Sequence, residues 1–148
     1  DPNTGTQGPN VNVTVAPEPS KVEPTAGEEV VRTWQALESA LNIHHTHIAE
    51  VVTLREEVVK ANTEVYNILM YQAEVRRSYR YGEINEQIMY IESGVSGFEC
   101  RTASAKADGL QAQLRDAERL AQLSLASVAA AQREFSKAVK RYAQESRK

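Results

Sequence analysis

The chain contains 148 residues, of which 41% are hydrophobic and 25% are charged, and its formal net charge is −3. A chain of this length suits one domain, and a charge so close to zero favours neither a nucleic-acid-binding surface nor an acidic tail. No run of apolar residues approaches the roughly 18 that a bilayer-spanning helix needs, so we expect a soluble protein. The single cysteine, Cys100, excludes an intrachain disulfide and leaves an interchain bridge or a free thiol.

Residues 1–27 hold all five prolines and three of the seven glycines. Proline breaks a helix, and a polar, Gly-rich segment has little apolar surface to bury, so we predict a flexible, extended and largely irregular N-terminal arm. Within it Val11, Val13 and Val15 alternate with polar residues, which favours an arm that adds a strand to the sheet edge of another protein. The alternative is a linker in which the alternation has no role.

A long helix is predicted over residues 28–80. No proline occurs from Glu28 onward, and apolar side chains recur at alternating steps of three and four, the spacing of a seam where helices pack. The predicted seam, with eight apolar positions, comprises Trp34, Leu37, Leu41, His44, Ile48, Val51, Arg55, Val58, Asn62, Val65, Leu69 and Gln72. Thr25 is the expected N-cap, with Glu29 near the positive end of the helix dipole, and Gly82 is the expected left-handed end.

The positions beside this seam are also mostly apolar, among them Val52, Leu54, Val59, Tyr66 and Ile68. A two-stranded coiled coil buries only the two seam positions of each heptad, so apolar flanks indicate at least two neighbouring helices. The first helix is therefore expected inside a three- or four-helix bundle.

Residues 83–147 are predicted to return alongside the first helix. Their four-three spacing runs through Ile84, Ile88, Ile91, Val95, Phe98, Thr102 and Ala105, and resumes from Leu110 through Leu114, Ala117, Ala121, Ser124, Val128, Ala131, Phe135, Ala138 and Tyr142. Gly94 and Gly97 weaken the middle and Asp108-Gly109 is a turn signal, so residues 93–109 are a candidate break. The predicted fold of residues 28–148 is all-α: a long antiparallel helical hairpin, or a three-helix bundle if the break occurs, with coiled-coil-like packing.

All three histidines fall within four positions, at His44, His45 and His47. They lean toward the predicted packing side, and His44 and His47, three residues apart, can reach one ion. His44 and His47 are the candidate ligands of a divalent transition metal such as Zn²⁺ or Ni²⁺, completed around the axis of an oligomer, or a layer that loosens below about pH 6. The alternative is a partly wet helix interface, and no other cofactor is expected.

Arg55, Asn62 and Gln72 are polar residues within the predicted seam. An unpaired amide in a dry core costs roughly 1–3 kcal/mol, which penalises slipped registers. The predicted role of the three residues is to set register or oligomer number, and exposure at the rim of a loose bundle is the alternative.

Two basic clusters fall at the predicted helix ends. They are Arg76, Arg77 and Arg80, and the tail that includes Lys137, Lys140 and Arg141. Arginines interleaved with tyrosines suit nucleic-acid stacking, but cations also stabilise helix C-termini, and this second explanation is the plainer one. Nucleic acid and anionic lipid are therefore not the expected partners.

No catalytic motif is recognisable: the sequence has no Gly-rich phosphate loop, no GxSxG and no HExxH, and no histidine within fifty residues of Cys100. We expect a non-enzymatic structural or assembly protein, a homo-oligomer that self-associates through a broad apolar helical face in an envelope fibre, surface appendage or virus particle. The alternative is an exported helical binding module that uses the histidines for metal or the basic helix ends for an anionic partner. The polar start without methionine resembles the tether after a cleaved export signal, or the product of maturation cleavage.

Overall fold

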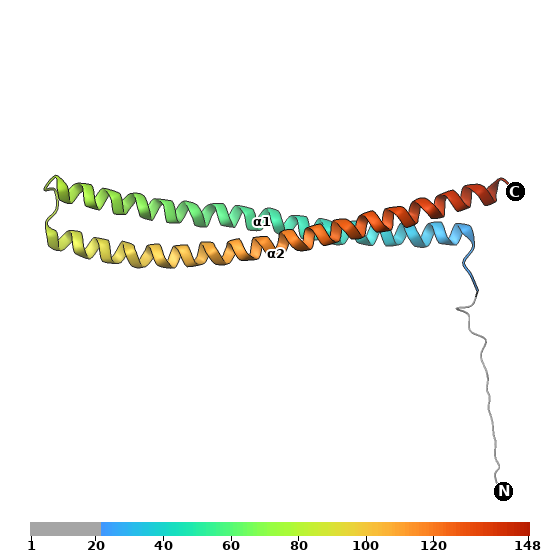
Figure 1. Ribbon diagram of the computed structural model, residues 1–148, viewed down its shortest axis with the longest axis horizontal. Coiled ribbons are helices and arrows are strands. Elements are labelled where there is room, and N and C mark those ends of the chain that lie inside the picture. Colours follow the sequence, from blue (N-terminus) through green and yellow to red (C-terminus); the bar gives the residue numbers. More distant parts are fainter. Residues whose placement is uncertain (1–21) are drawn as a thin grey trace, which may run out of the picture.

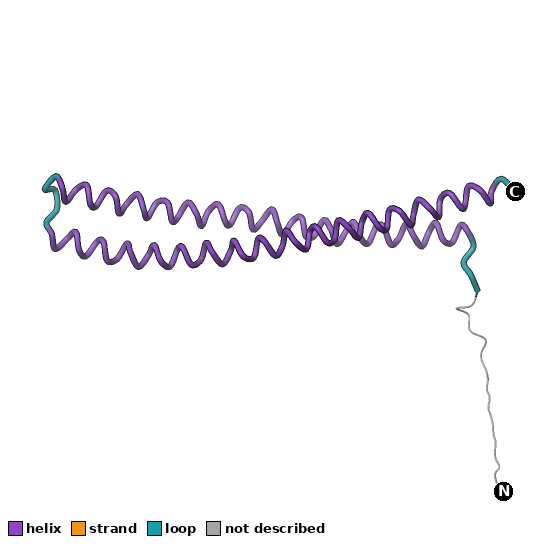
Figure 2. The backbone as a smooth tube through the Cα atoms, viewed as in Figure 1, coloured by secondary structure: helices purple, strands orange, loops and turns teal. Residues whose placement is uncertain are grey.

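The computed structural model describes residues 22–148, which form two long helices (Figure 1). Helix α1 spans Ala26–Arg80 (55 residues) and helix α2 spans Glu86–Ser146 (61 residues). They lie antiparallel and side by side, joined by one short turn, so that the start of α1 is beside the end of α2 (Figure 2). We call that end the open end and the other the turn end. The strand-adding role predicted for Val11, Val13 and Val15 falls outside the described residues.

The predicted all-helical fold is confirmed, and of the two alternatives that the spacing leaves open the structure has the hairpin. Helix α2 is continuous across residues 93–109, so the described chain has no third helix. Gly94 and Gly97 each weaken a helix by about 1 kcal/mol relative to alanine. Opening the helix there would, however, also expose Ser96 and Ala103, which are buried against α1, so continuity is favoured.

Both helices begin at capped ends, as the sequence predicts for α1. The backbone N–H of Glu28 donates to Thr25 Oγ1 (3.1 Å), and the N–H of Thr25 donates to Glu28 Oε1 (2.8 Å), which is a capping box. These two bonds hold the pKa of the Glu28 carboxyl below its ordinary value. At the start of α2, the N–H of Ile88 donates to Asn85 Oδ1 (2.9 Å).

Helix α1 ends at a left-handed glycine, as predicted. Gly82 has a φ of +75°, and its N–H donates to the carbonyl of Tyr79 (3.0 Å) while the N–H of Glu83 donates to that of Ser78 (2.9 Å). These bonds satisfy carbonyls that would otherwise be left free at the helix end. The chain is thereby reversed within five residues, between Arg80 and Glu86.

The two helices pack against each other along residues that are spaced alternately four and three apart, and we call this row of residues the interior seam. Its positions on α1 are Ala26, Val30, Thr33, Leu37, Ala40, His44, His47, Val51, Leu54, Val58, Ala61, Val65, Ile68, Gln72 and Val75. On α2 it runs through Met89, Ser93, Ser96, Cys100, Ala103, Ala107, Leu110, Leu114, Ala117, Ala121, Ser124, Val128, Ala131, Phe135 and Ala138. All of these residues are buried or half-buried. A strict seven-residue repeat makes two helices supercoil, and the helices cross in Figure 1 as supercoiled helices do.

The seam predicted for α1 is half right. Its positions Leu37, His44, Val51, Val58, Val65 and Gln72 belong to the interior seam, whereas Trp34, Ile48, Arg55, Asn62 and Leu69 are exposed and Leu41 is half-buried at its edge. The hairpin instead buries the opposite flank, which includes Leu54, Ala61 and Val75. When a stripe has apolar residues on both flanks, two different sets of residues show the same four-three spacing. A single neighbouring helix can cover only one of these sets.

The seam predicted for α2 is confirmed from Leu110 to Ala138 and wrong before it. Ile88, Ile91, Val95 and Phe98 are exposed, and the interior seam continues in phase through the small residues Ser93, Ser96, Cys100, Ala103 and Ala107. Because α2 is one continuous helix, the residues that face α1 in its second half also determine which residues face α1 in its first half. The large side chains near the turn are therefore carried to the outside.

Polar residues in the interior seam are satisfied mainly by their own helix. The hydroxyl of Thr33 donates to the carbonyl of Glu29 (2.8 Å), that of Ser96 to Glu92 (2.8 Å) and that of Ser124 to Ala121 (2.9 Å). Such bonds remove the desolvation penalty of a buried hydroxyl. Small polar residues can thus sit in the seam where they keep the helices close.

Replacing Gly109 by alanine should stabilise the hairpin by about 1 kcal/mol, because Gly109 lies inside α2 and no atom lies within 4 Å of the added Cβ. The matched variant is Gly82→Ala, which should destabilise it by about 1–2 kcal/mol because alanine disfavours a positive φ. Urea denaturation followed by helical circular dichroism measures both. A less stable Gly109→Ala protein would contradict a continuous α2.

Candidate functional site

One long side of the hairpin carries a row of exposed or half-buried apolar residues, interrupted near its middle by Arg55, Asn62 and Glu118, and we call it the apolar face. Its residues are Val31, Trp34, Leu41, Ile48, Val52, Val59, Tyr66 and Leu69 of α1, with Tyr90, Leu125 and Val139 of α2. The ion pair between Arg55 and Glu118 shows that both sets share one side. Arg55 occupies the same heptad position as Ile48, and Glu118 the same position as Leu125.

The apolar face has the size of a protein interface. Trp34, Val52 and Val59 are 47%, 50% and 64% exposed. An aromatic side chain alone carries about 150–250 Å² of surface, so the face as a whole exposes on the order of 800 Å², which is what one partner contributes to a stable complex. The largest exposed apolar patch on a monomeric soluble protein is usually smaller, about 300–600 Å².

Two of the three residues predicted to set register lie on the apolar face. Arg55 donates from Nη2 to Glu118 Oε2 (2.9 Å), and both side chains are substantially exposed. Asn62, one heptad further on, is also exposed. Within one hairpin these two residues therefore stand at the rim. Only Gln72 is in the interior seam, where the register set by His44 and Ser124 places it level with Ser96.

The histidines divide between the interior seam and the surface. His44 Nδ1 lies 2.8 Å from Ser124 Oγ, across the seam. His47 is also in the seam, and its Nδ1 is buried without a hydrogen-bond partner, whereas His45 is exposed. Among residues 22–148, no group of three or more His, Cys, Asp or Glu side chains is placed to hold a metal ion. A metal at His44 and His47 would therefore need further ligands from another copy.

Replacing His47 by leucine should stabilise the hairpin by about 1–3 kcal/mol, because the substitution removes a buried nitrogen that lacks a partner. The matched variant His45→Leu changes an exposed neighbour and should leave the free energy of unfolding nearly unchanged. Urea denaturation at fixed protein concentration measures both variants. If His47→Leu is less stable than the unmodified chain, His47 has a partner that the described contacts do not include.

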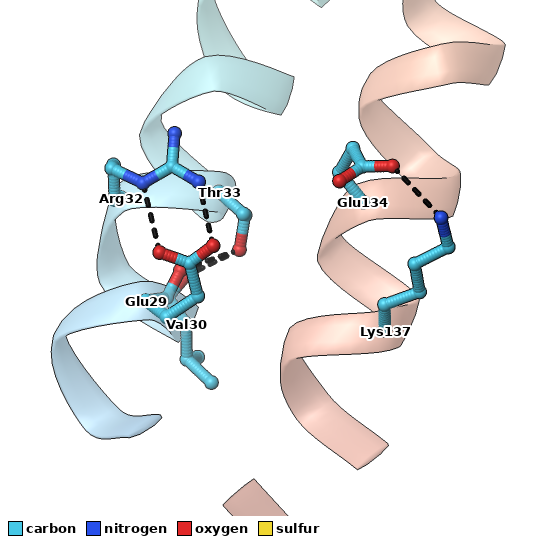
Figure 3. Close-up of polar contacts among 6 residues, drawn as sticks. All are labelled: Glu29, Val30, Arg32, Thr33, Glu134 and Lys137. Carbon is cyan, nitrogen blue, oxygen red and sulfur yellow. Dashed lines mark hydrogen bonds and ion pairs between the residues drawn. The ribbon is translucent and has the colours of Figure 1, made fainter. Parts of the chain in front are cut away.

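Charged residues at the open end pair within their own helices. Arg32 donates from Nε and Nη2 to the two carboxylate oxygens of Glu29 (2.9 and 2.6 Å), and Lys137 Nζ donates to Glu134 (3.2 Å) (Figure 3). The bond from Arg32 holds the pKa of the Glu29 carboxyl below its ordinary value. Arg141 likewise donates to Glu145 (2.9 Å).

The two predicted basic clusters are partly neutralised by these pairs. Arg77 pairs with Glu74 on its own helix and lies over the ring of Tyr81, 5.8 Å from its centroid. In the described chain no ion pair involves Arg76, Arg80 or Lys140. Arg77 and Arg80 lie in the last turn of α1, where they fit the dipole explanation, whereas the last turn of α2 holds no basic residue.

The apolar face is visible in the sequence but not distinguishable there from a buried seam. Trp34, Ile48 and Leu69 have the spacing of core residues. The signal that separates them is the pair Arg55 and Asn62, because two polar residues in consecutive heptads fit an exposed stripe better than a two-helix core.

No protein-family model, curated protein or solved structure matches this chain. Neither of the two described helices contains a stretch long and apolar enough to cross a membrane. The functional argument therefore rests on the surfaces of the hairpin itself.

Proposed function

We propose that the protein is a non-enzymatic structural or assembly protein that self-associates through the apolar face. The observation that supports this is the row of exposed apolar residues that extends along the hairpin on both sides of the Arg55–Glu118 pair. Each helix of the hairpin has only one neighbour, so large apolar residues of α1 such as Trp34, Val52 and Val59 stay uncovered. A second hairpin laid on the apolar face would bury it and complete a four-helix bundle.

A second copy is the occupant that the surface favours. The apolar face is long and straight, and an equally long straight partner with the same apolar residues is another copy of this hairpin. A two-fold contact needs a self-complementary patch, and a stripe with aliphatic residues at both ends and the Arg55–Glu118 pair near its middle meets this requirement.

Envelope fibres, surface appendages and virus particles are the settings in which we place such a protein. A long helical hairpin that pairs along its length would suit an extended assembly of this kind, and the N-terminal arm would then reach a different protein. An exported or virion location is part of the same proposal.

The double substitution Val52→Glu with Val59→Glu should convert the oligomer into a monomeric hairpin, because it places two charges at the centre of the apolar face. Light scattering across a range of concentrations gives the mass, and circular dichroism reports whether the helices persist. The matched control is Thr53→Glu with Lys60→Glu, one residue along on the polar outside of α1. We expect this control to keep the mass of the unmodified protein. A monomeric unmodified protein at all concentrations would contradict the proposal.

Replacing Arg55 and Asn62 together by leucine should raise stability but give oligomers of mixed size. Both residues lie on the apolar face, so an assembled protein would bury them, and polar groups there penalise slipped registers. Size-exclusion chromatography with light scattering measures the distribution, and thermal melting measures the stability. A single product of the original size would show that the two residues do not set register.

A further inference from the structure

A second apolar surface lies on the outside of α2 near the turn, and we call it the turn-end stripe. It consists of Ile88, Ile91, Val95, Phe98, Thr102 and Ala105. Ile91 and Phe98 are 56% and 65% exposed. Each lies two residues from the seam residues Ser93 and Ser96, which is about 200° of helix rotation, so the stripe points away from α1. Helix α1 cannot cover it.

The stripe is joined to a groove between the two helices. The groove has a volume of about 600 Å³, and Ile68, Tyr71, Phe98 and Ala103 are among its lining residues. Tyr71 donates its hydroxyl to Glu92 Oε2 (2.5 Å), which raises the pKa of the Tyr71 phenol above its ordinary value. Phe98 and Thr102 belong to both the groove and the stripe, and charged residues of the groove such as Glu99 and Lys106 border the stripe.

We propose that the turn-end stripe packs antiparallel against the same stripe of a second copy, about a two-fold axis between Val95 and Phe98. The four-three spacing of the stripe is that of a coiled-coil seam. In this register each layer combines two side chains of unequal size: Val95 with Phe98, Ile91 with Thr102, and Ile88 with Ala105. Two copies of Gly94 meet beside the axis, where no atom lies within 4 Å of a Cβ added to either glycine in the single hairpin.

Charge complementarity selects this orientation. The hairpin shows how residues beside an antiparallel seam pair, because Arg55 meets Glu118 beside the interior seam and the pair is shifted along the helices relative to the residues within it. The same shift applied to the turn-end stripe brings Glu92 of each copy to Lys106 of the other, which gives two ion pairs. A parallel arrangement would instead bring Arg101 close to Lys106. The two copies of Glu99 meet across the axis and weaken the contact, which keeps it reversible.

The contact area is modest. The four large side chains expose roughly half of the 800 Å² that each partner contributes to a stable interface. Stripe pairing is therefore a concentration-dependent contact. It rests on the proposed function in one respect: if the apolar face also pairs, each resulting dimer carries two free stripes, and stripe pairing links dimers into an open chain.

Disulfide trapping tests the register directly. In a Cys100→Ser background, Gly94→Cys should give a disulfide-linked dimer under mild oxidation, because the proposed pairing places the two thiols opposite each other beside the axis. The matched control is Asp108→Cys, two heptads along on the same side of α2, where antiparallel pairing holds the two thiols roughly 40 Å apart at 1.5 Å per residue. We expect loss of the linked dimer in this control, and linkage of both variants would show parallel pairing and overturn the proposal.

The same variants separate this inference from the proposed function. Gly94→Cys is combined with Val52→Glu and Val59→Glu, which disrupt only the apolar face. Linkage that persists in this background supports stripe pairing whatever the role of the apolar face. Adding Phe98→Lys should abolish the linkage. If Gly94→Cys links no better than Asp108→Cys in either background, the stripe does not pair, and the light-scattering result for the apolar face stands on its own.

Discussion

The interior seam between α1 and α2 is the contact on which the rest of the structure depends. It follows one four-three repeat from the open end to the turn, and it sets larger residues of α1 such as Val51 and Ile68 against smaller ones of α2 such as Ala117 and Cys100. Small residues let two helices approach closely, and serine and threonine hydroxyls in the seam bond back to their own helix. The seam therefore tolerates serine and threonine.

A two-helix seam has a direct consequence for the surface. Only two positions of each heptad are covered when a helix has one neighbour, and this chain has apolar residues at several others. The uncovered residues collect into the apolar face along α1 and the turn-end stripe on the outside of α2. Both surfaces arise from the same limit, which is why we propose assembly rather than a ligand pocket as the role of the hairpin.

Particular residues show how far sequence reasoning reaches. Thr25 and Gly82 are predictable because capping and left-handed backbone are local properties of one or two residues. The second half of the seam on α2 is predictable because its four-three spacing continues without a break from Leu110 to Ala138. Trp34 and Ile48 are misplaced because α1 has two apolar flanks, and Ile91 and Phe98 because the large residues near the turn are out of phase with the rest of α2.

The sequence by itself determined the class of fold, the two ends of α1, the reversal at Gly82 and the presence of more apolar surface than a hairpin can bury. Tertiary structure alone decided which apolar flank is covered, whether α2 breaks at its glycines, and which residues remain outside. The physical reason is that periodicity specifies the positions on a helix that can be buried. The choice among them depends on the phase of the partner helix and on how closely the two backbones approach, and both are properties of the packed pair.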